Sequence, residues 1–111
     1  MKFWSTEIDE FFAIGYNLHE LGVNNWALKK HEALTALKQL LILQVPILGG
    51  DVYEKHNGNI QQNYDNWYCN KLDDESKIDF IDRSIKIAID YIENYNIQDE
   101  EFILFTLVPE I

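Results

Sequence analysis

At 111 residues, of which 47% are apolar and 14% aromatic, the chain is long enough for one domain with a buried core and too apolar for a disordered acidic tail. Its formal net charge of −10 argues against a nucleic acid or an anionic membrane as partner, because like charges repel. We therefore expect a single domain over residues 1–111 that, if it has a partner, binds a basic one.

The negative charge is concentrated in the second half of the chain. Residues 1–50 carry five acidic and four basic side chains, a balance of −1, whereas residues 51–111 carry fourteen acidic and five basic side chains, a balance of −9. A solubilising surface and a docking surface for a basic partner both explain this asymmetry.

The sequence gives no sign of disulfides, cysteine-bound zinc or membrane insertion. Cys69 is the only cysteine, and the first residues lack the apolar core of a signal peptide. The longest apolar run, Leu40–Leu48, is far shorter than the roughly 20 residues that span a bilayer. These features predict a cytoplasmic protein without a cofactor.

The first predicted element is a helix over Thr6–Leu21, with apolar side chains on one face, acidic side chains in its first turn and Gly22 to end it. The next segment, Gly22–Leu28, is ambiguous. Its apolar residues suit a short strand, but Asn25 could also cap a helix that runs straight on. We favour the strand, because a regular helical pattern begins only after Lys29.

A second helix is predicted from Lys29 until Pro46 stops it, with Gln44 and Val45 extended ahead of the proline. The following segment, Val45–Lys55, reads as a central strand that is apolar on both faces at its start. Gly50 is suited to a bend or a bulge in that strand.

Asn57-Gly58 predicts a tight hairpin, because both residues tolerate the positive φ angles of a type I′ turn. The returning strand is expected over Ile60–Cys69. Its pairing register decides which of its aromatic rings face the core.

A long helix is predicted next, with the acidic residues Asp73–Glu75 at its start and apolar residues at helical spacing from Ile78 to Ile92. The segment Glu101–Val108 reads as a buried strand because of its length and branched side chains, and Pro109 ends it.

The predicted order is thus a helix followed by β-α-β-β-α-β, which indicates an α+β fold. Helices packed on one face of a three- or four-stranded mixed sheet are the economical arrangement, and a ferredoxin-like arrangement matches this order. If Gly22–Leu28 is not a strand, three strands remain.

Catalytic and metal-binding patterns are weak. The three histidines stand at no recognisable metal-ligand spacing, and Cys69 has no announced base, so a small core residue is the simpler interpretation. Asp51, Glu54 and Asp65 could meet across the hairpin at a calcium or magnesium ion, although carboxylates on strands are more often solvated.

The mixture of aromatic and acidic residues around the hairpin is the better signal. Tyrosine and tryptophan are common anchors of binding surfaces, although the same rings could simply fill the space between sheet and helix. As a docking surface, the segment would use Tyr53, Trp67 and Tyr68 as anchors. Its carboxylates would come from Asp51, Glu54, Asp65, Asp73 and Asp74.

The same segment carries a family resemblance. Its blocks are ILGGDVYE (Ile47–Glu54), YDNWYC (Tyr64–Cys69), NNWAL (Asn24–Leu28) and DFIDRS…YIENY (Asp79–Tyr95). Together they resemble the immunity protein 40 family of bacterial polymorphic toxin systems. The likeness runs from about Gly22 to Val108, and residues 1–21 match no pattern.

The resemblance implies a small cytoplasmic protein, not an enzyme, that neutralises a partner toxin, often but not always a nuclease. Our first hypothesis is an immunity protein that occludes a cognate, basic toxin domain through the acidic and aromatic surface. The alternative is a small-molecule-binding regulatory module on a ferredoxin-like sheet, with a pocket lined by the same rings. An enzymatic role has little support, because no catalytic pair stands at a recognisable spacing.

Overall fold

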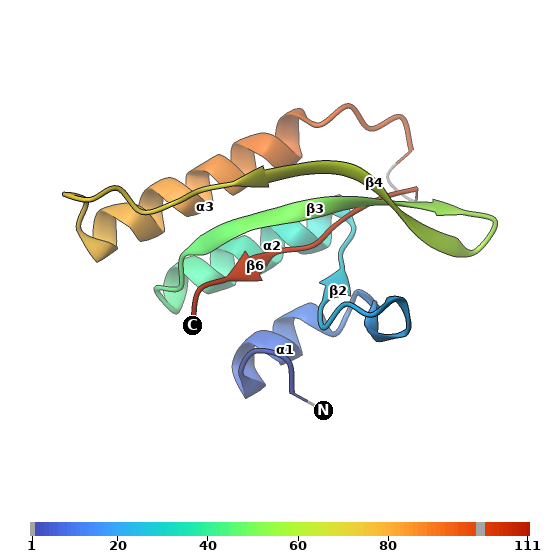
Figure 1. Cartoon of the computed structure of the whole chain (residues 1–111), viewed down its shortest axis with the longest axis horizontal. Helices are drawn as coiled ribbons and strands as arrows, with labels where there is room; N and C mark the ends of the chain where they lie inside the picture. The colour runs from blue at the N-terminus through green and yellow to red at the C-terminus, as the bar shows by residue number, and fades with distance from the viewer. Residues whose placement is uncertain (1, 100–101) are drawn as a thin grey trace.

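The computed structural model describes residues 2–99 and 102–111, and Figure 1 shows the arrangement of their helices and strands. In chain order these are α1 (Thr6–Phe12), β1 (Tyr16–Asn17), the 3₁₀ turn η1 (His19–Leu21), β2 (Trp26–Ala27), α2 (Lys30–Ile42), β3 (Ile47–His56), β4 (Asn59–Tyr68), α3 (Lys77–Asn94), β5 (Ile103–Phe105) and β6 (Val108–Pro109). The predicted α+β class is confirmed.

The main sheet is built around β3. Strand β4 pairs with one edge of β3, while β5 and β6 pair in succession with the other edge, and a bridge from Leu28 to Phe105 joins the segment after β2 to β5. Every described pairing is antiparallel, whereas we expected a mixed sheet. Helix α3 joins β4 to β5, which run parallel on either side of β3. Helix α2 joins the segment after β2 to β3, with β5 between them, so both crossovers resemble split β-α-β units.

The first helix is shorter than predicted. Ser5 caps α1, since its Oγ accepts a hydrogen bond from the Ile8 amide at 3.1 Å, but the helix ends at Phe12 instead of Leu21. The chain turns at Gly15, where a Cβ would lie 2.5 Å from the Ala27 carbonyl oxygen. Strand β1 then pairs with β2, which confirms a strand within Gly22–Leu28 and adds one that the sequence did not predict.

The C-terminus of α2 also differs from the prediction. Gln44 has a φ of +58° and is not extended, because the chain leaves the helix through a left-handed residue. The Gln44 amide donates to the Leu41 carbonyl and the Val45 amide to the Leu40 carbonyl, so the last carbonyls of the helix are satisfied.

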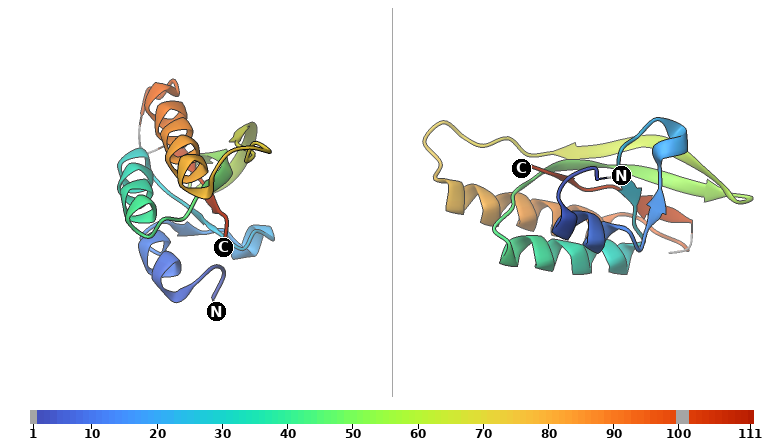
Figure 2. Two further views of the ribbon diagram at one scale, coloured as in Figure 1. Left: turned by 90° about the vertical axis from the view of Figure 1, so that its left-hand side faces the viewer. Right: turned by 90° about the horizontal axis from the view of Figure 1, so that it is seen from below.

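Helices α2 and α3 lie side by side on one face of the sheet, and α1 lies next to α2 (Figure 2). The main core fills this space with buried apolar side chains from all three helices and from β3, β4 and the C-terminal segment. A smaller cluster forms where the β1–β2 segment packs against β3 and β5. Its buried residues are Leu18, Ala27, Tyr53 and Leu104.

The hairpin forms as the sequence predicts. Asn57 and Gly58 have φ angles of +53° and +83° and connect β3 to β4 in a two-residue turn. Further along, Asp51 pairs with Asn66 and Tyr53 with Gln62, so the three residues from Asn63 to Asp65 face one residue of β3. This bulge interrupts β4 near its middle.

Candidate functional site

The Gly49-Gly50 pair serves packing in this structure. A Cβ at Gly50 would lie 2.1 Å from the Thr106 carbonyl oxygen and 2.4 Å from Cη2 of Trp67, and a Cβ at Gly49 would lie 2.2 Å from the Trp67 carbonyl oxygen. Only glycine allows the neighbouring strands and the indole ring to approach so closely. The two glycines therefore create the space that Trp67 fills.

Two of the rings that we expected on a docking surface are buried, and their predicted exposure is wrong. Trp67 is 7% exposed, because its pairing with Gly50 places it on the helix-covered face, where it stacks on Tyr91 at a centroid distance of 4.7 Å. Tyr53 is 4% exposed and packs in the smaller cluster, which includes β2. Burial, together with the charge of Asp51, raises the pKa of Tyr53.

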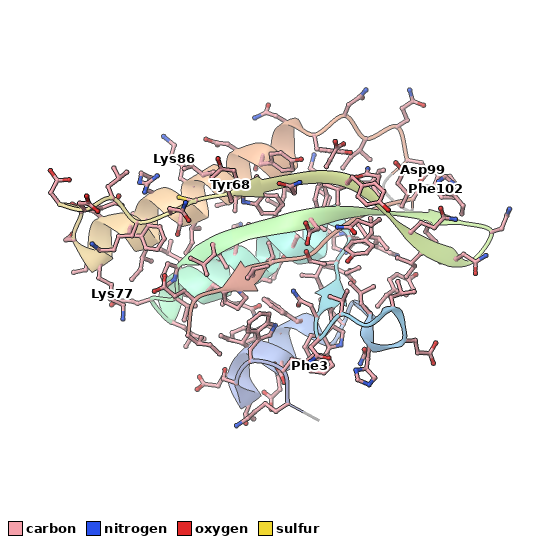
Figure 3. All side chains as sticks on the ribbon, viewed as in Figure 1. Phe3, Tyr68, Lys77, Lys86, Asp99 and Phe102 are labelled. Carbon is pink, nitrogen blue, oxygen red and sulfur yellow. The ribbon has the colours of Figure 1, made fainter. Side chains whose placement is uncertain are left out.

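The two tyrosines of β4, in contrast, are exposed. Tyr68 is 76% exposed and pairs with Gly49, one position away from the Gly50–Trp67 pair, so it points to the face that the helices leave open (Figure 3). Tyr64, in the bulge, is 80% exposed. A shallow hollow of about 190 Å³ lies where β3 pairs with β4, and residues that line it include Leu48, Asp51, Asn66 and Val108.

A hydrogen-bond network fixes the bulge to the end of α3. Asn63 donates through Nδ2 to Glu54 Oε2 at 3.1 Å and to the Tyr95 hydroxyl at 2.9 Å, and its Oδ1 accepts from the Asp65 amide at 2.9 Å. The Tyr95 hydroxyl donates to Asp65 Oδ2 at 2.5 Å. Hydrogen bonds from Asn63 and His56 lower the pKa of Glu54, whereas burial and the bond to Asp65 raise the pKa of Tyr95 to about 12.

The loop after β4 separates its acidic residues. Asp73 and Asp74 are exposed, whereas the Glu75 side chain is 8% exposed and is held by Arg83, with Nε to Oε2 at 2.7 Å and Nη2 to Oε1 at 2.8 Å. Arg83 Nη2 also donates to the Asn70 carbonyl at 2.7 Å. The hydrogen bonds from Arg83 lower the pKa of Glu75 to about 2, so the carboxylate stays charged and keeps its contact with Arg83.

The predicted surface is therefore divided by the structure. Asp65 and Tyr68 are exposed on β4, with Asp51 and Glu54 half-buried on the neighbouring strand, while Asp73 and Asp74 lie in the loop beyond it. Sequence reasoning missed the roles of Asn63, Tyr64, Asn66 and Tyr95. The asparagines around Tyr64 were a signal for a bulge or turn, but no periodicity shows which of them leaves the strand.

Other kinds of site find little support in the described part of the chain. Cys69 is buried, and residues 2–99 and 102–111 contain no group of three His, Cys, Asp or Glu side chains placed to hold a metal ion. A larger open hollow of about 430 Å³ is lined by residues of α1 and the residue after it, together with Lys2 and Trp26. None of the helices described is both long and apolar enough to cross a membrane.

A family model for immunity protein 40 matches residues 17–109, from the end of β1 to the end of β6. The chain belongs to the immunity protein 40 family. The residues that place it there include both strands of the hairpin and exclude α1, so the exposed part of β4 lies within the family domain. Membership identifies this chain as an immunity protein with a toxin as its implied partner.

Neither the curated proteins nor the solved structures contain a match to this immunity protein. Helix α1 lies outside the matched range but is part of the same fold, since Ile8 and Phe12 are in the main core. Asn25 ties the ends of the domain together. Its Oδ1 accepts from Trp4 Nε1 at 3.3 Å, and its Nδ2 donates to the Leu107 carbonyl at 2.9 Å.

Proposed function

We propose that this immunity protein binds one cognate toxin domain of a bacterial polymorphic toxin system and neutralises it by occlusion. The observation that carries this proposal is the family match over residues 17–109. The contact is made by what we term the β4 surface, which consists of Asp51, Glu54, Tyr64, Asp65, Asn66 and Tyr68.

The composition of the β4 surface supports a protein partner. Exposed tyrosines provide large, rigid contact areas with a polar end, and they are enriched among the residues that dominate binding energy. Tyr64 and Tyr68 offer such rings without any need to open the core. The buried Tyr53 and Trp67 pack in the two core clusters, and this packing role replaces the anchoring role that the sequence suggested for them.

The charge of the β4 surface favours a basic toxin. Asp65 follows Tyr64 in the bulge, and the half-buried Asp51 pairs with Asn66, two residues before Tyr68. Glu54 bonds Asn63 of the bulge, and Asp73 and Asp74 extend the negative charge into the following loop. For a nuclease toxin, these groups would take the place of substrate phosphates. In this proposal the protein acts in the cytoplasm, without a cofactor or catalytic residues, and binds neither nucleic acid nor membrane.

Co-expression tests the proposal directly. The toxin domain encoded beside this protein is produced alone and together with it, and growth and co-purification are measured. We expect restored growth and a stable complex that buries on the order of 1,600 Å². Continued toxicity without a complex would reject the proposal.

Charge reversal tests whether the carboxylates of the loop after β4 help to attract the toxin domain. Asp73→Lys with Asp74→Lys should slow association with the toxin domain by about tenfold and flatten its salt dependence, because long-range attraction sets the encounter rate. The matched control is Asp82→Lys with Asp90→Lys, which makes the same change in net charge at exposed positions of α3. Equal slowing in both pairs would assign the effect to net charge and not to the β4 side of the molecule.

A further inference from the structure

Three described residues other than glycine have a positive φ: Gln44 at +58°, Asn57 at +53° and Tyr64 at +71°. Gln44 ends α2, where a left-handed residue allows the last carbonyls to be satisfied, and Asn57 is in the hairpin turn, which requires this conformation. Both positions have a reason in the local chain path.

The bulge in β4 accounts for the left-handed conformation at position 64, but not for a tyrosine there. A left-handed conformation is costly for a bulky side chain, whereas asparagine adopts it readily. Asn63 precedes Tyr64 and Asn66 follows two positions later, so a residue suited to this conformation is close by on each side. The sequence nevertheless places a tyrosine at the strained position.

The surroundings hold Tyr64 in this conformation. The Asn66 side chain donates to the Tyr64 carbonyl at 3.1 Å, and Asn63 Oδ1 accepts from the Asp65 amide. Tyr95 bonds both Asn63 and Asp65, and its ring packs edge-on against the buried Phe105 at a centroid distance of 5.6 Å. The bulge is therefore anchored to the core through Tyr95.

The Tyr64 ring gains little from this arrangement in the isolated protein. It is 80% exposed, and in the described part of the chain it stacks on no other ring. Strained residues that the surrounding structure enforces are concentrated at binding and catalytic sites. A ring carried by a backbone that is held at a conformational cost, and left in solvent, is suited to contact a partner with little further loss of backbone freedom.

We infer that Tyr64 is a preorganised anchor that receives a lysine or arginine side chain of the toxin domain. This inference rests on the proposed function. The face of an exposed tyrosine attracts a cation. Asp65 follows Tyr64 in the chain, and Glu54 accepts a hydrogen bond from Asn63 of the same bulge. Carboxylates beside an aromatic ring favour a basic side chain over an acidic or purely apolar one.

The bulge also disfavours the addition of a strand of the partner to this part of β4. Asn63 and Asn66 already bond the Asp65 amide and the Tyr64 carbonyl, so these backbone groups are occupied by side chains of the same chain. Recognition at the bulge therefore depends on the Tyr64 ring and its neighbouring carboxylates.

Replacement of Tyr64 by glycine distinguishes the backbone strain at this position from the contact that its ring makes with the toxin domain. Tyr64→Gly removes the ring and suits a φ of +71°, so we expect a melting temperature at least as high as that of the unmodified protein, with a dissociation constant for the toxin domain raised at least tenfold. Gln44→Gly is the matched control, because it relieves the same kind of strain at an exposed position just after α2. It should not change the dissociation constant.

Two further variants test the cation. Tyr64→Phe keeps an aromatic face and should change the dissociation constant less than threefold. Tyr64→Leu keeps an apolar side chain without an aromatic face and should raise it about tenfold. Binding is measured calorimetrically with the same toxin domain, and melting temperatures are measured for each variant alone.

Each result is decisive for a different claim. If the unmodified protein binds the toxin domain and Tyr64→Gly binds equally well, the inference about Tyr64 is overturned while the proposed function stands. A clear fall in melting temperature for Tyr64→Gly would overturn the strain argument. Equal binding of Tyr64→Phe and Tyr64→Leu would exclude the cationic contact, and failure of the unmodified protein to bind would count against the proposed function itself.

Discussion

Trp67 and Tyr68 are neighbours in the chain but belong to opposite sides of the sheet. Trp67 lies over Gly50 and stacks on Tyr91 of α3, whereas Tyr68 is exposed on the side that the helices leave open. The alternation of a strand therefore divides one aromatic segment between two tasks. The helix-covered side supplies stability, and the open side together with the bulge supplies the surface that we propose for the toxin.

The largest expected contrast comes from truncating these two rings. Trp67→Ala should lower the free energy of unfolding by about 3–5 kcal/mol, because it leaves a cavity between the sheet and α3. Tyr68→Ala should change it by no more than about 0.5 kcal/mol. Denaturant unfolding of both variants measures the difference, and a similar loss in both would contradict the division between core and surface.

A smaller effect is expected at the glycine beneath Trp67. Gly50→Ala should cost about 3 kcal/mol, since the added Cβ would meet the Thr106 carbonyl and the indole ring. Gly58→Ala provides the comparison, because its φ of +83° is strained for alanine but no atom lies within 4 Å of the new Cβ, and about 1 kcal/mol is expected. Equal costs would show that the sheet can shift to accommodate a side chain at Gly50.

The bulge predicts a dependence of stability on alkaline pH. Because the pKa of Tyr95 is raised from 10.0 to about 12 in the folded protein, its contribution to stability is complete below pH 10 and is lost as the pH rises towards 12. Between pH 10 and pH 12, the Tyr95→Phe variant should therefore lose less stability than the unmodified protein. At neutral pH the variant should be less stable by about 1 kcal/mol, because Asn63 and Asp65 lose a partner.

Thermal unfolding from pH 8 to pH 12 measures this difference. Tyr53 and Tyr91 also have raised pKa values, so part of the alkaline loss should remain in Tyr95→Phe. Superimposable pH profiles for the two proteins would exclude Tyr95 as a source of the loss.

The last expected effect is a dependence of stability on acidic pH that comes from the loop after β4. The folded protein lowers the pKa of Glu75 from 4.5 to about 2, so the contribution of this carboxylate is present above pH 4.5 and is lost as the pH falls towards 2. Glu75→Gln should therefore flatten the acid side of the stability profile. Glu93→Gln, at an exposed position of α3, is the control and should leave that profile unchanged.

The sequence was most informative where local chemistry decides the structure. The periodicity of α3, the Asn57-Gly58 turn and the division of α2 from β3 by Pro46 all depend on neighbouring residues, and each appears in the structure. The early end of α1 depends instead on the approach of Gly15 to Ala27 in β2, which no local pattern reveals.

The surface was harder to predict for a related reason. The register of β4 against β3 decides that Trp67 is buried and Tyr68 exposed, and a bulge between those strands decides where Tyr64 points. Tyr53 looked like a surface ring because the cluster that covers it includes Leu18 and Ala27, which are distant in sequence. Composition singled out the segment that we propose for binding, whereas only the strand pairing shows which of its side chains are exposed.

The position of β5 and β6 has a consequence for synthesis in the cell. Strand β3 has β4 on one edge and acquires its other neighbours only from residues 103–109, and the buried Asn25 bonds the carbonyl of Leu107. A nascent chain that stops after α3 would thus expose the interior of its sheet along a free edge. We expect protection against the toxin to begin only when the ribosome has passed this last segment, so that fragments released earlier would be degraded instead of acting as weak inhibitors.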